Sequence, residues 1–125
     1  MAEASLTSAL LVMAGGAIGA LLRYAVALMT SNYHSLPLST LLVNFAGCTL
    51  LVLFFFLWNP LPDNARLFFF IGVFGAFTTM SSVSLETISL YVEGHPGIAA
   101  LNFALNVCAC AGGAILGRAA AVLLS

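Results

Sequence analysis

The sequence predicts an all-α membrane protein with four transmembrane helices, and two observations lead to this fold class. The first is composition: of 125 residues, 62% are hydrophobic and only 6% are charged, with a mean hydropathy of +1.15. A soluble domain carries roughly 25% charged residues, so this chain could not cover a water-exposed surface with polar groups. The second is length, because four apolar runs each approach or exceed the ~20 residues that a helix needs to cross a bilayer.

The four predicted spans occupy about residues 6–29, 39–58, 67–91 and 97–123. Segments rich in Gly, Pro, Asn and Ser separate them, at residues 31–37, 59–64 and 93–97. We therefore expect one four-helix membrane domain over residues 1–125, crossing the cell membrane several times. The N-terminal Met-Ala-Glu-Ala-Ser lacks a basic region, which argues against a cleavable signal peptide.

The first and fourth spans contain small residues at the spacing that allows close helix contact. The two segments read Gly15-Gly-Ala-Ile-Gly19 and Gly112-Gly-Ala-Ile-Leu-Gly117. Such patterns predict tight packing, but they do not say which helices meet.

The third span is interrupted where a continuous apolar helix is expected. After Leu67-Phe-Phe-Phe-Ile71, the chain reads Gly72-Val-Phe-Gly-Ala-Phe-Thr-Thr-Met-Ser-Ser-Val-Ser-Leu-Glu86. Non-helical backbone at membrane depth is tolerated only where protein buries it or water lines it. We therefore expect the third helix to be broken in mid-membrane, and we expect an ion to be held near the break.

Basic residues give almost no orientation signal. Arg66 and Arg118 lie toward the N-terminal side of the membrane and Arg23 toward the other, and the chain has no Lys. The positive-inside rule needs an excess of basic residues on one side. Dual topology and a weakly biased single topology both remain open. Four helices leave little lumen, so a transport route is expected at an interface between subunits.

The residues that enzymes need are missing from the predicted spans. The histidines, His34 and His95, lie in turns, and the cysteines form no Cys-x-x-Cys pair. A nucleophile with a base beside it is not evident. We expect a protein that is not an enzyme and has no nucleic-acid partner.

Uncharged hydrogen-bonding groups are abundant at membrane depth instead. Asn44 lies in the second span, and Asn102, Asn106 and Cys110 recur every four residues on one face of the fourth. The third span adds Thr78, Thr79, Ser81, Ser82 and Ser84. Such groups can donate to an anion, or they can hydrogen-bond helices to one another. As a set around a broken helix, they favour a polar track.

The break also suggests a cation site. Carbonyls that lose their helical donors, around Gly75 and Thr78, could cage a monovalent ion such as Na⁺ if two breaks met on a dimer axis. A glycine kink satisfied by threonine hydroxyls is the alternative. Arg23 could reach the interface, or it could concentrate anions at a vestibule.

Three segments, taken as a set, resemble the Fluc (CrcB) family of fluoride channels. They read Gly-Gly-x-x-Gly-x-x-x-Arg-Tyr at 15–24, Thr40-Leu-Leu-Val-Asn44-x-x-Gly47, and Gly72-x-x-Gly75-x-x-Thr-Thr-x-Ser-x-x-Ser-x-Glu86. They cover three of the four spans, and the chain length and number of spans also match.

The resemblance implies an antiparallel dimer of four-helix subunits, with two fluoride pores along the subunit interface. It implies a structural Na⁺ that is not transported, held on the dimer axis by backbone carbonyls of Gly75 and Thr78. Asn44 would correspond to a pore-lining asparagine and Arg23 to a vestibule arginine. The fluoride pathway would further include the polar residues Ser81, Ser82, Asn102 and Asn106.

One departure from the family concerns its pore aromatics. The family places two pore phenylalanines in a pattern like Thr-Phe-Ser-Thr-Phe-Ser, and the same register here reads Thr79-Met80-Ser81-Ser82-Val83-Ser84. Either Met80 and Val83 form a non-aromatic constriction, or this chain is one half of a heterodimer with a related subunit that supplies a working pore.

The leading interpretation is a fluoride-specific channel that passively exports cytoplasmic F⁻ and so reduces its toxicity. One alternative is a non-conducting or heterodimer partner subunit of such a channel. Another is a small dual-topology multidrug exporter, which would need a carboxylate deep in the membrane.

Overall fold

The structure, a computed structural model, describes residues 5–30 and 37–125, and within these ranges the chain is helical with short connections. Helix α1 (Leu6–Thr30), helix α2 (Leu38–Leu57) and helix α6 (Pro96–Leu124) are continuous. Residues 31–36 of the first predicted turn lie outside the described residues. Helix α6 begins at Pro96, a position where the missing N–H of proline has no helical partner to lose.

The third crossing is built from several helical pieces. Helix α3 (Asp63–Arg66) leads into η1 (Leu67–Phe74), a π-helical segment, and then into α4 (Gly75–Phe77). Two extended residues follow, and α5 (Met80–Val92) completes the crossing. The predicted break in the third helix is confirmed.

Four helical stretches are long and apolar enough to cross a membrane: Leu6–Thr30, Leu38–Leu57, Asp63–Val92 and Pro96–Leu124. They confirm the four spans expected from hydropathy. The third differs most from its predicted bounds, because the polar turn at its start is already helical from Asp63.

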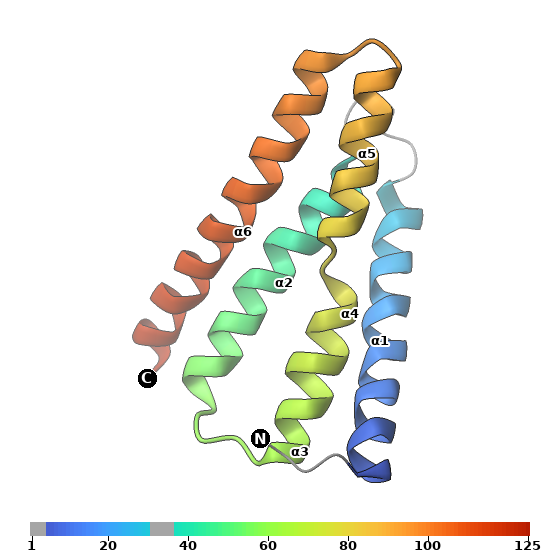
Figure 1. The fold of residues 1–125 in the computed structure, drawn as a ribbon. Coiled ribbons are helices and arrows are strands. Elements are labelled where there is room, and N and C mark those ends of the chain that lie inside the picture. The colour runs from blue at the N-terminus through green and yellow to red at the C-terminus, as the bar shows by residue number, and fades with distance from the viewer. Residues whose placement is uncertain (1–4, 31–36) are drawn as a thin grey trace.

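Neighbouring crossings run in opposite directions, and the break divides the third crossing between two neighbours (Figure 1). Before the break, η1 and α4 pack against α1; after it, α5 packs against α6. Helix α2 packs along α6 and makes a smaller contact with α1. Because of the break, the first half of the third crossing packs on α1 and the second half packs on α6.

Glycines bring these pairs into backbone contact. A Cβ added at Gly15 or Gly19 would lie 2.2 Å from the Phe68 carbonyl oxygen or 2.1 Å from that of Val73, both on η1. A Cβ at Gly117 would lie 2.2 Å from the Thr49 oxygen on α2. The predicted small-residue motifs thus pack α1 on η1 and α6 on α2, which the sequence left undecided.

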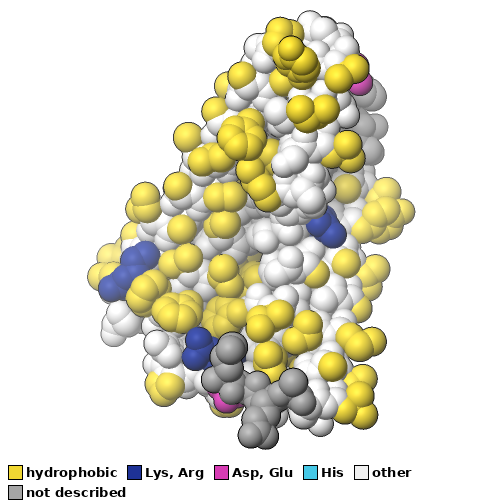
Figure 2. All heavy atoms as spheres, in the orientation of Figure 1, with side chains coloured by type: hydrophobic (Ala, Val, Ile, Leu, Met, Phe, Trp, Pro, Cys, Tyr) yellow, Lys and Arg dark blue, Asp and Glu magenta, His cyan; other side chains and the backbone are white. Residues whose placement is uncertain are grey.

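The surface is apolar and the buried residues are unusually polar. Hydrophobic side chains spread over the face drawn in Figure 2, with few charged groups among them. Inside the described part of the subunit, the buried apolar side chains are Val43, Phe74, Val83, Ala99 and Ala121. Equally buried are Thr40, Asn44, Thr79, Asn102 and Asn106. A lipid-facing protein needs no apolar core, so polar contacts can hold its helices together.

Candidate functional site

The centre of the site is the break between α4 and α5. Thr78 has φ −79° and ψ 155°, and Thr79 has φ −155° and ψ 115°, so both adopt extended backbone. An extended pair interrupts the i→i+4 hydrogen bonds of a helix. Thr79 is nevertheless buried, so its peptide groups need partners from within the protein.

The side chain of Asn44 supplies those partners. Its Oδ1 accepts from the Thr79 N–H at 2.8 Å, and its Nδ2 donates to the Thr79 carbonyl at 3.1 Å. The amide thus pairs with both backbone groups of one residue, as a neighbouring strand would. Close packing of α2 on the break allows this, because a Cβ at Gly47 would lie 2.3 Å from the Thr78 methyl.

A chain of amides extends from Asn44 into α6. Asn44 Nδ2 also donates to Asn106 Oδ1 at 3.0 Å. Asn106 Nδ2 donates to the Asn102 backbone oxygen at 3.0 Å and to its Oδ1 at 3.3 Å. Asn102 Nδ2 donates to Thr87 Oγ1 on α5 at 3.1 Å. Both hydrogens of the Asn44 amide are used inside the subunit.

Hydroxyl groups surround the N-terminus of α5. Thr79 Oγ1 accepts from the Ser82 N–H at 3.1 Å and caps the helix. The same oxygen donates to Ser82 Oγ at 3.0 Å, and Ser81 Oγ lies 3.1 Å from it. Among the described residues, every buried side-chain nitrogen and oxygen has a hydrogen-bond partner.

These contacts take the helical donors away from two carbonyls. In an unbroken helix the Thr79 N–H would bond the Gly75 carbonyl and the Ser82 N–H would bond that of Thr78. Here the first donates to Asn44 and the second to the Thr79 hydroxyl. The two carbonyls predicted as Na⁺ ligands are therefore those whose usual donors are bonded elsewhere, which fits a hard cation that takes oxygen ligands.

A polar cavity of about 380 Å³ opens beside the break, between α1, α2 and α5. Arg23, Thr79 and Ser82 line it, together with Thr40 and Glu86. Thr40 Oγ1 donates to Glu86 Oε2 at 2.8 Å. Sequence reasoning placed Arg23 and Ser82 at the site but missed Thr40 and Glu86, although Ser82 and Glu86 are four apart and so share a helix face.

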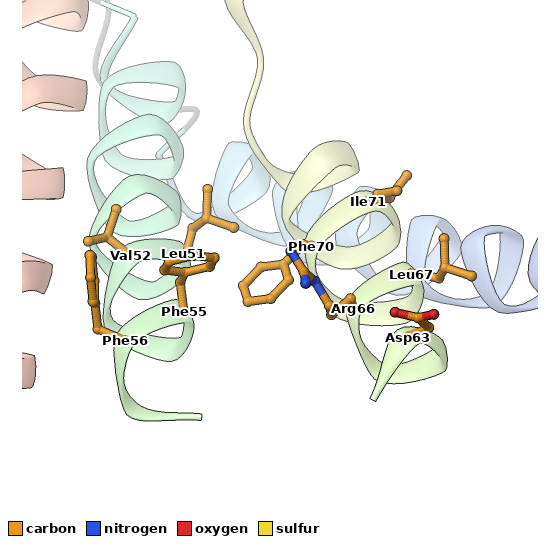
Figure 3. Close-up of a pocket in the computed structure, with 9 residues that line it drawn as sticks. All are labelled: Leu51, Val52, Phe55, Phe56, Asp63, Arg66, Leu67, Phe70 and Ile71. Carbon is orange, nitrogen blue, oxygen red and sulfur yellow. The ribbon is translucent and has the colours of Figure 1, made fainter. Parts of the chain in front are cut away.

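A second cavity, of about 540 Å³, lies between the C-terminal part of α2 and the start of the third crossing. Figure 3 shows Leu51 and Phe55 facing Phe70 across the gap, with the Arg66 side chain beside Phe70. Its lining is mostly apolar, so it offers an anion few partners.

The chain matches the family described as CrcB-like protein, Camphor Resistance (CrcB), over residues 10–118. It belongs to the CrcB family. Similar curated proteins are named fluoride-specific ion channel FluC. The one from Rhodospirillum rubrum is 39% identical and the alignment covers 93% of this chain and 95% of the relative. The one from Elusimicrobium minutum is also 39% identical, over 91% and 93%. For Coxiella burnetii the values are 39%, 86% and 92%.

The structure divides the residues expected along a pathway in this CrcB protein into two groups. Met80 is 47% exposed, Ser81 is exposed and Ser82 is partly exposed. Val83 has 0% exposure, and Asn44, Asn102 and Asn106 are buried within the subunit. A pathway along the surface of this chain would thus meet Met80 and Ser81 directly, whereas the buried residues would not line it.

Proposed function

We propose that this chain conducts fluoride passively out of the cell, across the membrane that its four helices span, and so lowers cytoplasmic fluoride. The observation that carries the proposal is a half-helix N-terminus, ringed by hydroxyls, at the break of a membrane span in a CrcB protein. Its relatives are named fluoride-specific ion channels. A channel needs no catalytic residues, and the chain is not an enzyme.

The chemistry of the α5 N-terminus suits a small anion. The first N–H groups of a helix have no intrahelical acceptor, and the helix dipole favours negative charge there. Ser81 and Ser82 add hydroxyls without adding a fixed positive charge. An anion can therefore bind, yet it is held weakly enough to leave, which conduction requires.

Arg23 is the basic residue of the polar cavity. A cationic side chain there raises the local anion concentration and does not need to contact the ion. We assign it the vestibule role, and Glu86, which lines the same cavity, accepts a hydrogen bond from Thr40.

The working unit is proposed to be an antiparallel dimer. Ser81, Ser84, Gly75 and Met80 are exposed in the single subunit near the middle of the third crossing. Hydroxyls and broken backbone are poorly suited to lipid, so a second copy would cover this face and enclose the route. Opposite orientations agree with the near-balanced arginines.

The dimer axis is the proposed place of a structural Na⁺. The Gly75 and Thr78 carbonyls would hold it, two from each subunit, and the ion would neutralise oxygens that lack helical donors. Gly75 suits such a site, because its only near neighbour for an added Cβ is the Phe70 oxygen at 3.6 Å and its surface is exposed.

A second candidate is a partner subunit that does not conduct alone. It is favoured by Met80 and Val83 at the positions where the family resemblance places phenylalanines. The multidrug exporter that the sequence left open is disfavoured, because the relatives are named ion channels.

Efflux from liposomes tests the proposal. The purified chain alone, reconstituted in vesicles loaded with F⁻, should release F⁻ when a K⁺ ionophore removes the opposing voltage, and it should not release Cl⁻ from matched vesicles. If the chain alone released no F⁻, the proposal would be contradicted. If F⁻ efflux then appeared when a related subunit was co-reconstituted, the partner role would be established instead.

A further inference from the structure

Asn106 is buried at 0% exposure, and its side chain hydrogen-bonds to Asn44 and Asn102. Its Oδ1 accepts one hydrogen of the Asn44 amide, and its own Nδ2 donates to Asn102 at 3.0 and 3.3 Å. These donations force the Asn106 oxygen, rather than its nitrogen, to face Asn44. Asn106 therefore presents only an acceptor at this point.

An acceptor at Asn106 sets the orientation of Asn44. A side-chain amide can rotate by half a turn and exchange its oxygen and nitrogen. In the flipped state, Asn44 Oδ1 would face the Thr79 carbonyl and Asn106 Oδ1, two acceptors, while its NH₂ would face the Thr79 N–H. The observed orientation avoids both conflicts, so it is the one that Asn106 and Thr79 select together.

The orientation of Asn44 in turn decides what happens to the Thr79 N–H. The Thr79 N–H donates to Asn44 Oδ1 instead of to the Gly75 carbonyl, its acceptor in an unbroken helix. If Asn44 turned, the Thr79 N–H would lose its steady acceptor, and because Thr78 and Thr79 are extended it would bond the Gly75 carbonyl only part of the time. The break would then close intermittently, and the Thr79 amide would be less protected from exchange.

We propose that Asn106 is a positioning residue that keeps the third span open, by holding the Asn44 amide in the orientation that binds Thr79. It acts on the Gly75 carbonyl and on the N-terminus of α5 through Asn44, and not by touching an ion. The effect of Asn106 on conduction rests on the proposed function. The hydrogen bonds from Asn106 to Asn44 and from Asn44 to Thr79 do not depend on that proposal.

Asn102 offers a matched control on the same helix. It is also an asparagine, is 2% exposed and belongs to the same chain of amides, but it is not bonded to Asn44. Replacing its side chain leaves the Asn102 backbone oxygen as an acceptor for Asn106. Asn102→Leu therefore removes a buried amide without removing the contact that orients Asn44.

Hydrogen exchange at Thr79 is the decisive measurement. In the full-length protein in lipid nanodiscs, Asn106→Leu should speed exchange of the Thr79 amide roughly fivefold relative to Asn102→Leu, the effect of weakening about one hydrogen bond. Added to Asn44→Ala, Asn106→Leu should change Thr79 exchange no further. Asn106→Asp in its protonated form is the same size, keeps an oxygen toward Asn44 and donates its O–H to the Asn102 backbone oxygen, so it should restore protection.

Cation dependence gives a second readout. The wild-type thermal transition should lie higher in Na⁺ than in a large organic cation. Asn106→Leu should lose at least half of this difference, and Asn102→Leu should keep most of it. Equal Thr79 exchange in Asn106→Leu and Asn102→Leu, or additive effects with Asn44→Ala, would overturn the positioning role. Absence of F⁻ flux from the wild type would contradict the proposed function instead.

Discussion

Asn44 is bonded to the break in the third crossing. The sequence left two roles open for such an amide, donation to an anion or hydrogen bonding between helices, and the family resemblance implied a place along the pore. In the subunit its oxygen and both amide hydrogens bond to Thr79 and Asn106. Asn44 therefore acts as a clamp, by which we mean that its side chain binds both backbone groups of Thr79 and holds the break in place. Any role along a pathway depends on the geometry that these bonds create.

Asn44→Leu should therefore abolish F⁻ flux and also destabilise the protein. It leaves the Thr79 N–H and carbonyl and Asn106 Oδ1 without their partner, at a cost of about 1–3 kcal/mol for each group left buried and unpaired. Flux from liposomes and the thermal transition in detergent measure the two effects. A variant as stable as the wild type would contradict the clamp.

Arg23→Ala should reduce F⁻ flux roughly tenfold at low ionic strength, because a vestibule charge concentrates the anion. The defect should shrink in ~1 M salt, where the screening length is about 3 Å. Arg118→Ala is the control, since that arginine lies over the Phe56 ring at 4.4 Å, away from the polar cavity. A loss of flux that does not depend on salt would mean that Arg23 is structural.

Met80 and Val83 should respond differently to phenylalanine. Met80 is 47% exposed, so Met80→Phe should fold normally and preserve or raise F⁻ flux. Val83 has no exposed surface, so Val83→Phe should overpack the interior and cost about 1–3 kcal/mol. Thermal transitions and flux of the two variants distinguish them. Equal stability would show that Val83 can turn toward the surface.

At the scale of elements, close contacts at glycines, the glycine seams, set how neighbouring helices pack. Gly15 and Gly19 let η1 approach α1, and Gly113 and Gly117 let α6 approach α2. Asn44 reaches the break from α2, which packs against Thr78 at Gly47. Gly16 and Gly112, next in sequence, face open space.

Gly19→Ala and Gly117→Ala should each destabilise the protein by about 1–3 kcal/mol, because the new methyl would meet backbone oxygens that cannot move aside. Gly16→Ala and Gly112→Ala are matched controls with nothing within 4 Å of the added carbon. Unfolding in detergent measures the four variants. If all four behave alike in the isolated subunit, the seams are not close contacts. If the two controls alone fail to dimerise, their faces belong to the subunit interface.

At the scale of the whole molecule, charge distribution bears on orientation. Arg66 ends α3 at the start of the third crossing, Arg118 lies near the C-terminal end of α6, and Arg23 lies past the middle of α1. Two arginines against one leave little preference for either insertion. An antiparallel dimer would need both orientations in one membrane. A single sequence can insert in both orientations only if its basic residues are nearly balanced between the two sides of the membrane.

Adding positive charge at one end should remove activity. Asn59→Lys with Asn64→Lys places two lysines on exposed residues, one in the connection before α3 and one within α3, and should force one orientation. That variant alone should lose F⁻ flux, and a copy biased the other way by Glu93→Lys should restore it on co-expression. Cysteine accessibility on intact cells reports orientation. Full flux from the singly oriented variant would contradict the antiparallel dimer.

Composition and periodicity were sufficient for the four spans and the interruption of the third, because these depend on local chain properties and on lipid excluding unpaired backbone. The family was predicted from the resemblance of three sequence segments. The sequence predicted Gly75 and Thr78 at the break, Ser82 on the polar track and Arg23 at a vestibule. It could not tell that Val83 points inward while Met80 points outward, or that Asn44 and Asn106 bond to each other. These facts depend on which helices pack together and on how each helix is rotated about its axis. Contacts at glycines between distant segments determine both. An amide finds its partner only after backbones 35 and 62 residues apart have come together.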